Sequence, residues 1–276
     1  CPRVCGVNRE AGQRGRCGSP AAMRVARAAL HHWEEPVISG TNGSGAVFFT
    51  GCGLQCVYCQ NFAISSDAMR GRAVTPEELS GIFSRLEDAG AHNINLVSAS
   101  QYVPLVVEAL RLRRPRVPVV YNSSGYESLD TLRLLEGLVD IYLPDYKYAI
   151  PETAARYSDA PDYPETALLA IKEMERQCGN RIMEGSLLKR GLLIRHLVLP
   201  LNVKNTLAVL QRIQTHFPGV PVRLMAQYTP AGKADAFPEL RRRAPNRDFD
   251  PAAADMHRMR LRGCVPARAT TVVDCI

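Results

Sequence analysis

Three cysteines lie close together at positions where their thiolates could hold a metal centre. Cys52, Cys56 and Cys59 are separated by three residues and then by two, directly after the apolar run Ala46–Phe49. Three thiolates can hold three irons of a [4Fe–4S] cube and leave the fourth iron open to a small molecule, whereas ordinary ferredoxin sites supply four cysteines at other spacings. Zinc usually takes a fourth protein ligand and paired cysteines. The spacing therefore favours an iron–sulfur centre that does chemistry over zinc or over three buried thiols.

An aromatic residue, Tyr58, stands directly before the third cysteine. With it, the pattern resembles the signature of the radical S-adenosylmethionine (SAM) superfamily. The resemblance implies that the amino and carboxylate groups of SAM chelate the open iron. It also implies that the reduced cluster cleaves SAM to methionine and a 5′-deoxyadenosyl radical, so that the cofactor supplies the difficult chemistry and the protein positions it.

Other stretches resemble relatives of the pyruvate formate-lyase activating enzyme, in particular the branch described as PflX-like, and together they are specific. The matching stretches are Cys1–Arg9, Ile38–Thr41, Cys56–Asn61, Ala91–Val97, Tyr121–Glu127, Asp140–Lys147, Arg195–Pro200 and Gln227–Pro230. In the activases the radical takes a hydrogen atom from a backbone glycine of a partner enzyme. The resemblance thus implies an oxidoreductase with a glycyl radical protein as partner and an electron donor such as flavodoxin or ferredoxin.

Two departures from the activases keep other functions open. The activases carry a Gly-Gly-Glu type motif where this chain has Ser98-Ala-Ser100, and the simplest activases lack the front cysteines. One alternative is a radical SAM enzyme acting on a small molecule or RNA. The other is a non-catalytic metal-binding protein, which predicts no cleavage of SAM.

The front of the chain forms a second cysteine group, which we expect to be a separate lobe over residues 1–22. Cys1, Cys5 and Cys17 lie among glycine and arginine without apolar periodicity, which predicts a loop-rich segment. Three thiols this close favour zinc or an auxiliary cluster. The alternative is three reduced, unliganded thiols on a frayed end.

Composition narrows the class of protein. Apolar residues make up 46% of 276 residues, enough for a sizeable core, and no apolar run reaches the ~18 residues that a membrane helix needs. No secretory leader is visible, and cysteine use fits metal binding in a reducing, cytoplasmic compartment. The net charge of +7 comes mostly from scattered arginines without interleaved aromatic residues, which argues against a nucleic-acid groove.

Alternating strand and helix patterns must position these residues. Thr75, Pro76 and Glu78 predict a capped helix start, and Gly90 its end. The segment from Met23 to Trp33 is compatible with a short helix or an extended lead-in. The expected strands are Ala46–Thr50, Asn93–Ser98, Val117–Tyr121, Val139–Leu143, Leu192–Leu199 and Val220–Met225; the expected helices after the first are Pro104–Leu112, Leu129–Leu135, Ala154–Gln177 and Thr206–His216.

Six apolar strands separated by helices predict an α/β fold of buried parallel strands. Six units are too few for an eight-fold barrel. They fit the open, partial (β/α)6 TIM-like barrel that the radical SAM resemblance implies, over residues 23–240. A doubly wound sheet is the alternative, although no glycine-rich phosphate loop follows the first strand. From 241 to 276 we expect an irregular, partly disordered tail.

Polar residues follow the strands at the ends where a barrel places its chemistry. Hydroxyls and amides can bind the SAM amino group and ribose, and Arg195 can pair with the methionine carboxylate. Asp145 and Lys147 are two apart in an extended segment and face the same way. We expect His196 to be a satisfied core histidine. The predicted cofactor-binding residues are Tyr58, Ser98, Ser100, Asn122, Ser124, Asp145, Lys147 and Arg195.

Overall fold

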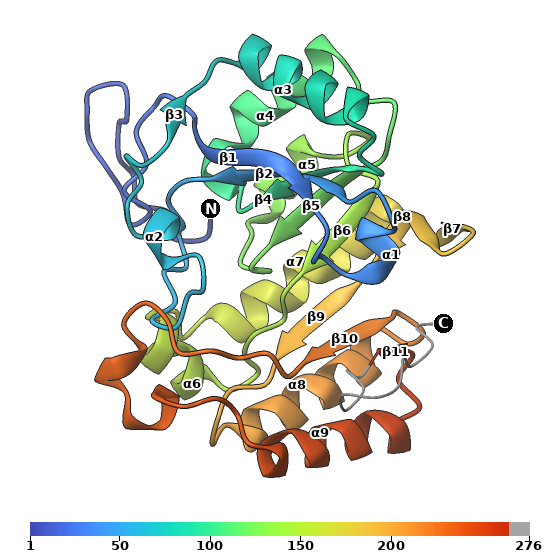
Figure 1. The fold of residues 1–276 in the computed structure, drawn as a ribbon. Coiled ribbons are helices and arrows are strands. Elements are labelled where there is room, and N and C mark those ends of the chain that lie inside the picture. Colours follow the sequence, from blue (N-terminus) through green and yellow to red (C-terminus); the bar gives the residue numbers. More distant parts are fainter. Residues whose placement is uncertain (265–276) are drawn as a thin grey trace.

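Six parallel strands form the frame of the molecule (Figure 1). The structure is a computed structural model that describes residues 1–264, so positions 265–276 of the expected tail lie outside the described residues. The parallel strands are β2 (Ser44–Phe49), β4 (Ile94–Val97), β5 (Val119–Ser123), β6 (Ile141–Pro144), β9 (Ile194–Leu197) and β10 (Val222–Met225). Parallel ladders join β2 to β4, β4 to β5, β5 to β6, and β9 to β10.

The frame bends where β6 passes from one neighbour to the next. Over its first half, β6 pairs in parallel with β8 (Leu187–Leu192), a strand of the eight-stranded sheet. Just beyond β6, Asp145 forms a parallel bridge with Arg195 of β9, and the Tyr146 amide donates to the Arg195 carbonyl at 2.8 Å. The eight-stranded sheet therefore continues into the three-stranded sheet at this point, and the six parallel strands follow one another in chain order.

Short antiparallel or edge strands flank this frame. β1 (Arg24–His31) lies antiparallel on β2, and β3 (Arg72–Ala73) lies antiparallel on β1. β7 (Ile182–Glu184) pairs with β8, and β11 (Gly263–Cys264) extends β10. Among residues 1–264 no ladder joins β3 or β1 to β11, so the barrel is open between them. The expected partial α/β barrel is confirmed, and the lead-in whose structure the sequence left open is strand β1.

Helices cover the outer face of the curled sheet (Figure 1). The longer ones are α3 (Pro76–Asp88), α4 (Val103–Leu112), α5 (Leu129–Leu134), α6 (Pro151–Ser158), α7 (Tyr163–Cys178), α8 (Val203–His216) and α9 (Asn246–Arg258). The short ones are α1 (Pro36–Ser39), α2 (Phe62–Ser65) and the 3-10 turns η1 (Ser100–Tyr102), η2 (Ala234–Ala236) and η3 (Pro238–Leu240). None of the helices in the described part of the chain is long and apolar enough to cross a membrane.

The two faces of the sheet pack differently. The outer face contributes Leu96 and Tyr121 to a large core with Phe83 of α3 and Leu110 of α4. The inner face holds a small apolar cluster in which Ile38 of α1 packs on the strands; the buried members are Ile38, Val120, Ile141, Leu143, Leu188 and Leu193. Polar side chains, among them Arg195, Asp145 and Asn122, occupy another part of the inner face.

Two expectations for helices need correction. The single helical section expected over Ala154–Gln177 is two helices, because Asp159 adopts a left-handed conformation (φ 49°) that ends α6 before α7 begins. The expected irregular tail contains α9, a 13-residue helix. The segment is mostly polar and carries Pro251 inside the helix, which hid a narrow apolar stripe in which Ala252 and Met256 are buried.

The predicted start of α3 is confirmed. The Glu78 amide donates to Thr75 Oγ1 at 3.2 Å, and the Thr75 amide donates to Glu78 Oε2 at 2.9 Å. These bonds satisfy amides that the helix itself cannot pair. Leu79, Ile82, Phe83 and Leu86 are buried, as the apolar spacing predicts.

Replacing the helix cap tests this local account. Thr75→Ala removes the side-chain acceptor, so we expect the free energy of unfolding to fall by about 1 kcal/mol. Urea unfolding followed by circular dichroism measures this change. Thr41→Ala, in an exposed loop, is the control and should change stability by less than about 0.5 kcal/mol. Equal effects of the two substitutions would contradict the capping assignment.

Candidate iron–sulfur site

The three central cysteines lie on one loop at the carboxyl end of β2. Cys52, Cys56 and Cys59 are free and partly exposed, and the loop carries them between β2 and α2. Gly51 begins the loop with φ 78°, and a Cβ there would lie 2.3 Å from Ser19 Oγ. Only glycine therefore lets the chain turn this closely against the N-terminal lobe. Gln55 also adopts a left-handed conformation (φ 50°), a strained geometry that is frequent at functional sites.

Each of the three sulfurs has hydrogen-bond donors next to it. Ser158 Oγ donates to Cys56 Sγ at 3.1 Å and Ser65 Oγ donates to Cys59 Sγ at 3.3 Å. The backbone amides of Leu54 and Gln55 donate hydrogen bonds to the sulfur of Cys52. Burial raises the pKa of Cys52 to about 12, with the Cys56 thiol adding to the rise. Burial also raises the pKa of Cys56, although Lys147 opposes it. Such thiols become thiolates when a metal supplies the positive charge.

This donor set fits an iron–sulfur cluster. Within residues 1–264, no three His, Cys, Asp or Glu side chains are close enough together to hold a single metal ion. A cube presents a separate iron to each thiolate, so its ligands need not converge on one point. Three soft sulfur donors with hydrogen-bond donors already aligned on them suit that arrangement.

Tyr58 is held by other tyrosines. Its ring meets those of Tyr148, Tyr157 and Tyr228 edge to face, with centroids 6.2–6.5 Å apart, and it is 4% exposed. Its hydroxyl lies 2.8 Å from that of Tyr148. The side chain therefore packs behind the cysteine loop. The predicted contact of Tyr58 with the adenine of SAM stays a prediction.

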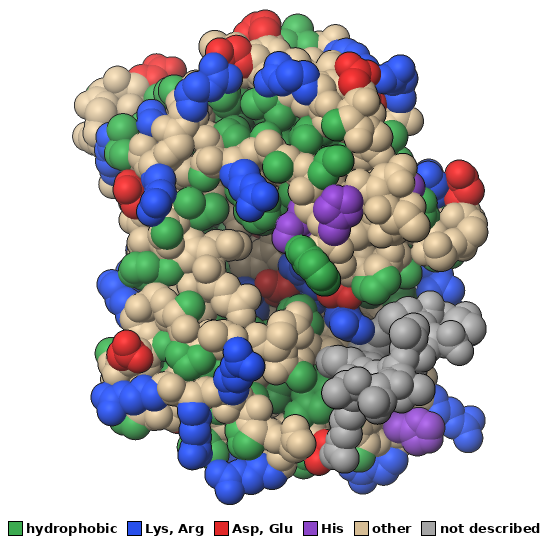
Figure 2. Space-filling view, in the orientation of Figure 1, with side chains coloured by type: hydrophobic (Ala, Val, Ile, Leu, Met, Phe, Trp, Pro, Cys, Tyr) green, Lys and Arg blue, Asp and Glu red, His purple; other side chains and the backbone are tan. Residues whose placement is uncertain are grey.

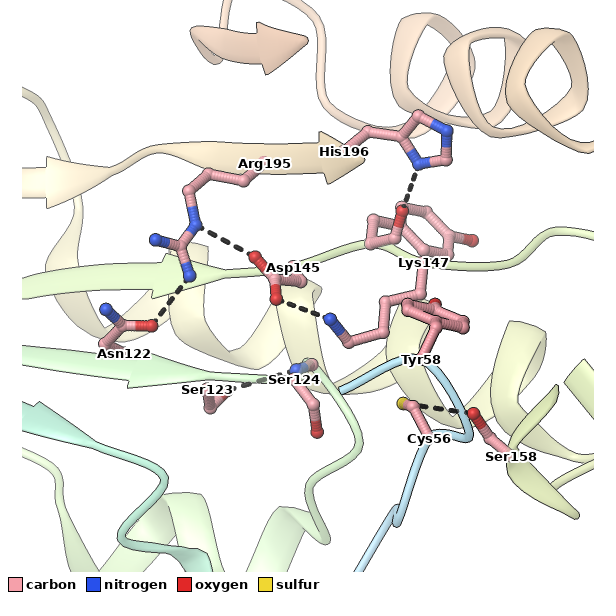
Figure 3. Close-up of polar contacts among 12 residues, drawn as sticks. Cys56, Tyr58, Asn122, Ser123, Ser124, Asp145, Lys147, Ser158, Arg195 and His196 are labelled. Atoms are coloured by element: carbon pink, nitrogen blue, oxygen red, sulfur yellow. Dashed lines mark hydrogen bonds and ion pairs between the residues drawn. The ribbon is translucent and has the colours of Figure 1, made fainter. Parts of the chain in front are cut away.

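A network of buried charges crosses the inner face of the barrel (Figure 3). The Arg195 guanidinium donates to Glu34 at 2.8 Å, to Asp145 at 2.9 Å and to Asn122 at 2.7 Å. Lys147 Nζ lies 2.6 Å from the other Asp145 oxygen, so these two side chains do face the same way. Burial alone would raise the pKa of Asp145, but Arg195 and Lys147 outweigh it and the pKa is lowered. The pair is enclosed, with side chains 15–17% exposed, and is not a surface ion pair.

The guanidinium of Arg195 is less available to a ligand than the sequence indicates. All three of its nitrogens already have protein partners, so a SAM carboxylate would have to share them. The main partner that sequence analysis missed is Glu34, which follows β1. Trp33 beside it is 89% exposed while the Glu34 side chain is 12% exposed. This inversion of the usual burial pattern could not be read from the sequence alone.

The predicted serines lie at the carboxyl ends of β4 and β5. Ser98 has a left-handed backbone (φ 59°), and Ser100 donates to Glu127. The Ser124 carbonyl accepts from the Tyr163 hydroxyl at 2.7 Å. The structure thus brings these residues to the same end of the barrel as the cysteine loop, and their contacts with a cofactor stay predictions.

Glu127 is a second residue that sequence analysis missed as part of a site. It is 1% exposed, and burial raises its pKa to about 7 although its bond with Ser100 opposes the rise. One oxygen, Oε2, has no hydrogen-bond partner among the described residues. The carboxyl therefore titrates near neutrality behind the ends of β4 and β5.

His196 is the satisfied core histidine that the sequence predicts (Figure 3). Its Nδ1 lies 2.7 Å from the Tyr146 carbonyl and its Nε2 lies 3.0 Å from Thr206 Oγ1. Burial lowers its pKa to about 4, so the ring is neutral at physiological pH.

The N-terminal cysteines line a cavity of about 700 Å³ beside the cysteine loop. Cys1 and Cys5 are exposed and Cys17 is buried. Arg9 donates to Cys17 Sγ at 3.3 Å, and the Arg16 amide donates to Cys5 Sγ at 3.3 Å. The three thiols share one cavity, but a second metal in this lobe stays a prediction.

The inner face is reachable from outside. Figure 2 shows a hollow near the middle of the molecule, with acidic and basic side chains at its floor. It opens on the side where the sheet does not close (Figure 1). The barrel interior is therefore approached from this open side.

Comparison with known proteins supports the fold and leaves the activity open. No protein-family model matches the chain. The uncharacterized protein MJ0674 of Methanocaldococcus jannaschii is 28% identical over 264 residues, which is 91% of this chain and 72% of that protein.

Two solved structures share the architecture. SuiB of Streptococcus suis, bound to S-adenosylmethionine, has a TM-score of 0.52 at 9% identity over 79% of this chain. Methylornithine synthase (PylB) has a TM-score of 0.51 at 14% identity over 77% of this chain. This chain spans 48% and 60% of the length of those two proteins. At such identities the likeness shows the fold alone.

The buried carboxyl predicts a pH dependence of stability. Glu127 keeps its proton to about pH 7 when folded, whereas its ordinary pKa is 4.5. The folded state therefore binds more protons in this window, and the stability from this group is lost as pH rises from 4.5 to 7. Unfolding free energies should show the parent losing up to about 3 kcal/mol relative to Glu127→Gln between pH 4.5 and 8. Glu108→Gln, at an exposed position on α4, is the control, and parallel pH profiles of parent and Glu127→Gln would contradict the assignment.

Proposed function

We propose that this chain is a radical SAM iron–sulfur enzyme in which Cys52, Cys56 and Cys59 hold three irons of a [4Fe–4S] cluster. The observation that carries the proposal is the cysteine loop. Three free thiols at the superfamily spacing stand at the carboxyl end of β2 in an open six-strand barrel, with hydrogen-bond donors on their sulfurs. When bound, the reduced cluster supplies one electron to SAM, whose carbon–sulfur bond breaks to give methionine and a 5′-deoxyadenosyl radical.

The charges on the inner face support a zwitterionic ligand. Three acidic groups, Glu34, Glu35 and Asp145, are balanced there by Lys147, Arg195 and Arg223. A ligand that carries both an ammonium and a carboxylate can pair with groups of either sign without leaving one uncompensated. The methionine end of SAM is such a ligand.

Individual residues have the following proposed roles. Asp145 accepts from the SAM ammonium and Lys147 orients its carboxylate, since each holds the other charged in a nearly dry site. Asn122 and the serines Ser98, Ser100 and Ser124 supply neutral donors and acceptors at the strand ends. Arg195 fixes Asp145 and shares its guanidinium with the ligand.

The finer assignment is to the pyruvate formate-lyase activating enzyme relatives, with a backbone glycine of a partner enzyme as substrate. The open side of the barrel supports it, because a peptide loop needs lateral access to the radical (Figure 2). A small molecule would need no such opening. A purely metal-binding role is the alternative, and it predicts no cleavage of SAM.

Cleavage of SAM tests whether this chain is a radical SAM enzyme. After anaerobic reconstitution with iron and sulfide and reduction with dithionite, we expect 5′-deoxyadenosine from SAM by liquid chromatography. Cys56→Ala should lose the cluster absorbance and reduce the product to background. Cys178→Ala is the matched control, because this buried free thiol lies at the end of α7. An intact cluster in the parent without any 5′-deoxyadenosine would contradict the proposal that this chain is a radical SAM enzyme.

Formation of a glycyl radical on a partner enzyme tests the assignment to the activating enzymes. With SAM, reductant and a glycyl radical enzyme present, we expect the doublet of a glycyl radical by electron paramagnetic resonance. Cys56→Ala should give no doublet and Cys178→Ala should give the parental one. If SAM is cleaved while a panel of such partners stays silent, the substrate is another molecule.

A further inference from the structure

Cys56 differs from the other two loop cysteines in what surrounds its sulfur. A side-chain hydroxyl, Ser158 Oγ, donates to it at 3.1 Å. The Lys147 ammonium also acts on it electrostatically and is held in place by Asp145 at 2.6 Å. Figure 3 shows Ser158 pointing at Cys56 from the end of its helix. The bond from Ser65 to Cys59 is longer, at 3.3 Å.

Ser158 is the last member of a chain of buried hydroxyls. Its Oγ lies 2.8 Å from the Tyr148 hydroxyl, which lies 2.8 Å from the Tyr58 hydroxyl. Each hydroxyl has one hydrogen to donate, and a thiolate can only accept. When Cys56 is a thiolate, the hydrogen of Ser158 therefore points to sulfur and the Tyr148 hydroxyl donates to Ser158. In this structure Tyr148 is the donor toward Tyr58, so its single hydrogen has to turn from Tyr58 to Ser158 in that state.

Arg3 fixes the position of Ser158 relative to the loop. Its guanidinium donates to the Ser158 carbonyl at 2.7 Å and to the Asp159 carbonyl, where α6 ends. The same group donates to the Gly53 carbonyl of the cysteine loop at 3.0 Å. The end of α6 and the loop are thus tied to one planar cation, which keeps the Ser158 hydroxyl within reach of sulfur.

We propose that the hydroxyl pair Tyr148–Ser158 raises the reduction potential of the cluster through the bond from Ser158 to Cys56. The inference rests on the ligation proposed above and deepens it by naming the groups that set how readily the site is reduced. One electron from an external reductant, dithionite in the test, is added without a proton. The thiolates then carry more negative charge, and a donor on sulfur stabilises that state. Buried hydroxyls suit this role because Ser158 and Tyr148 are enclosed, and a dipole in such surroundings acts more strongly than one in water.

The test is a potentiometric titration of the reconstituted chain without SAM, followed by electron paramagnetic resonance. Ser158→Ala should shift the midpoint potential to a more negative value. Tyr148→Phe should shift it in the same direction by less, because Ser158 remains but loses its own donor. Ser158→Thr keeps a hydroxyl and should stay near the parent. Ser84→Ala, whose hydroxyl bonds only within α3, is the control and should not move it.

Iron and sulfide contents are measured on every variant. A parental midpoint in fully loaded Ser158→Ala would overturn the proposal. If that variant does not load, Tyr148→Phe decides, and an unchanged midpoint there would overturn it too. Failure of SAM cleavage leaves the titration intact, so the two proposals can fail separately. Absence of a cluster signal in the parent would remove both.

Discussion

Arg195 is a charged group in an interior where its side chain is only 11% exposed, and much of the structure follows from that constraint. Such a cation is stable only when acidic partners reach it, and burial without them would cost several kcal/mol. Glu34, in the loop after β1, and Asp145, at the end of β6, both pair with Arg195. The backbone bridge between Asp145 and Arg195 is also where the two sheets join. Asp145 and Arg195 therefore compensate each other's charge and also join the two sheets of the barrel.

The two sides of the candidate site have different physical characters. On one side acidic and basic groups compensate one another around Arg195. On the other, Tyr58, Tyr148 and Tyr163 are fully enclosed, and Tyr148 and Tyr163 meet at a centroid distance of 5.1 Å. The cysteine loop lies beside this tyrosine-rich side, and Lys147 links the two because it pairs with Asp145 and acts on Cys56. In such a dry setting each remaining dipole and charge acts over a longer range than in water.

The sequence predicts the features that depend on residues close to one another along the chain. Apolar runs separated by capped helices are enough to predict the partial barrel, and the spacing of Asp145 and Lys147 is enough to predict that they share a direction. Glu34 could not be paired with Arg195, because the partners are 161 residues apart and meet only once the barrel curls. Ser158 is 102 residues from Cys56 for the same reason. Helix α9 was missed because it is mostly polar and contains Pro251, although its few apolar side chains fall on one face.

Leaving the barrel open exposes strand edges, which are templates for pairing between molecules. The eight-stranded sheet ends in β3 at one edge and β7 at the other, and these strands are two and three residues long. Ladders this short offer few unpaired amides and carbonyls to a second chain. On the open side, however, β3 covers only Arg24 and Val25 of β1, so within the described part of the chain residues 26–31 have no strand partner there, and Arg27 is the charged side chain on this stretch that disfavours pairing with a second molecule.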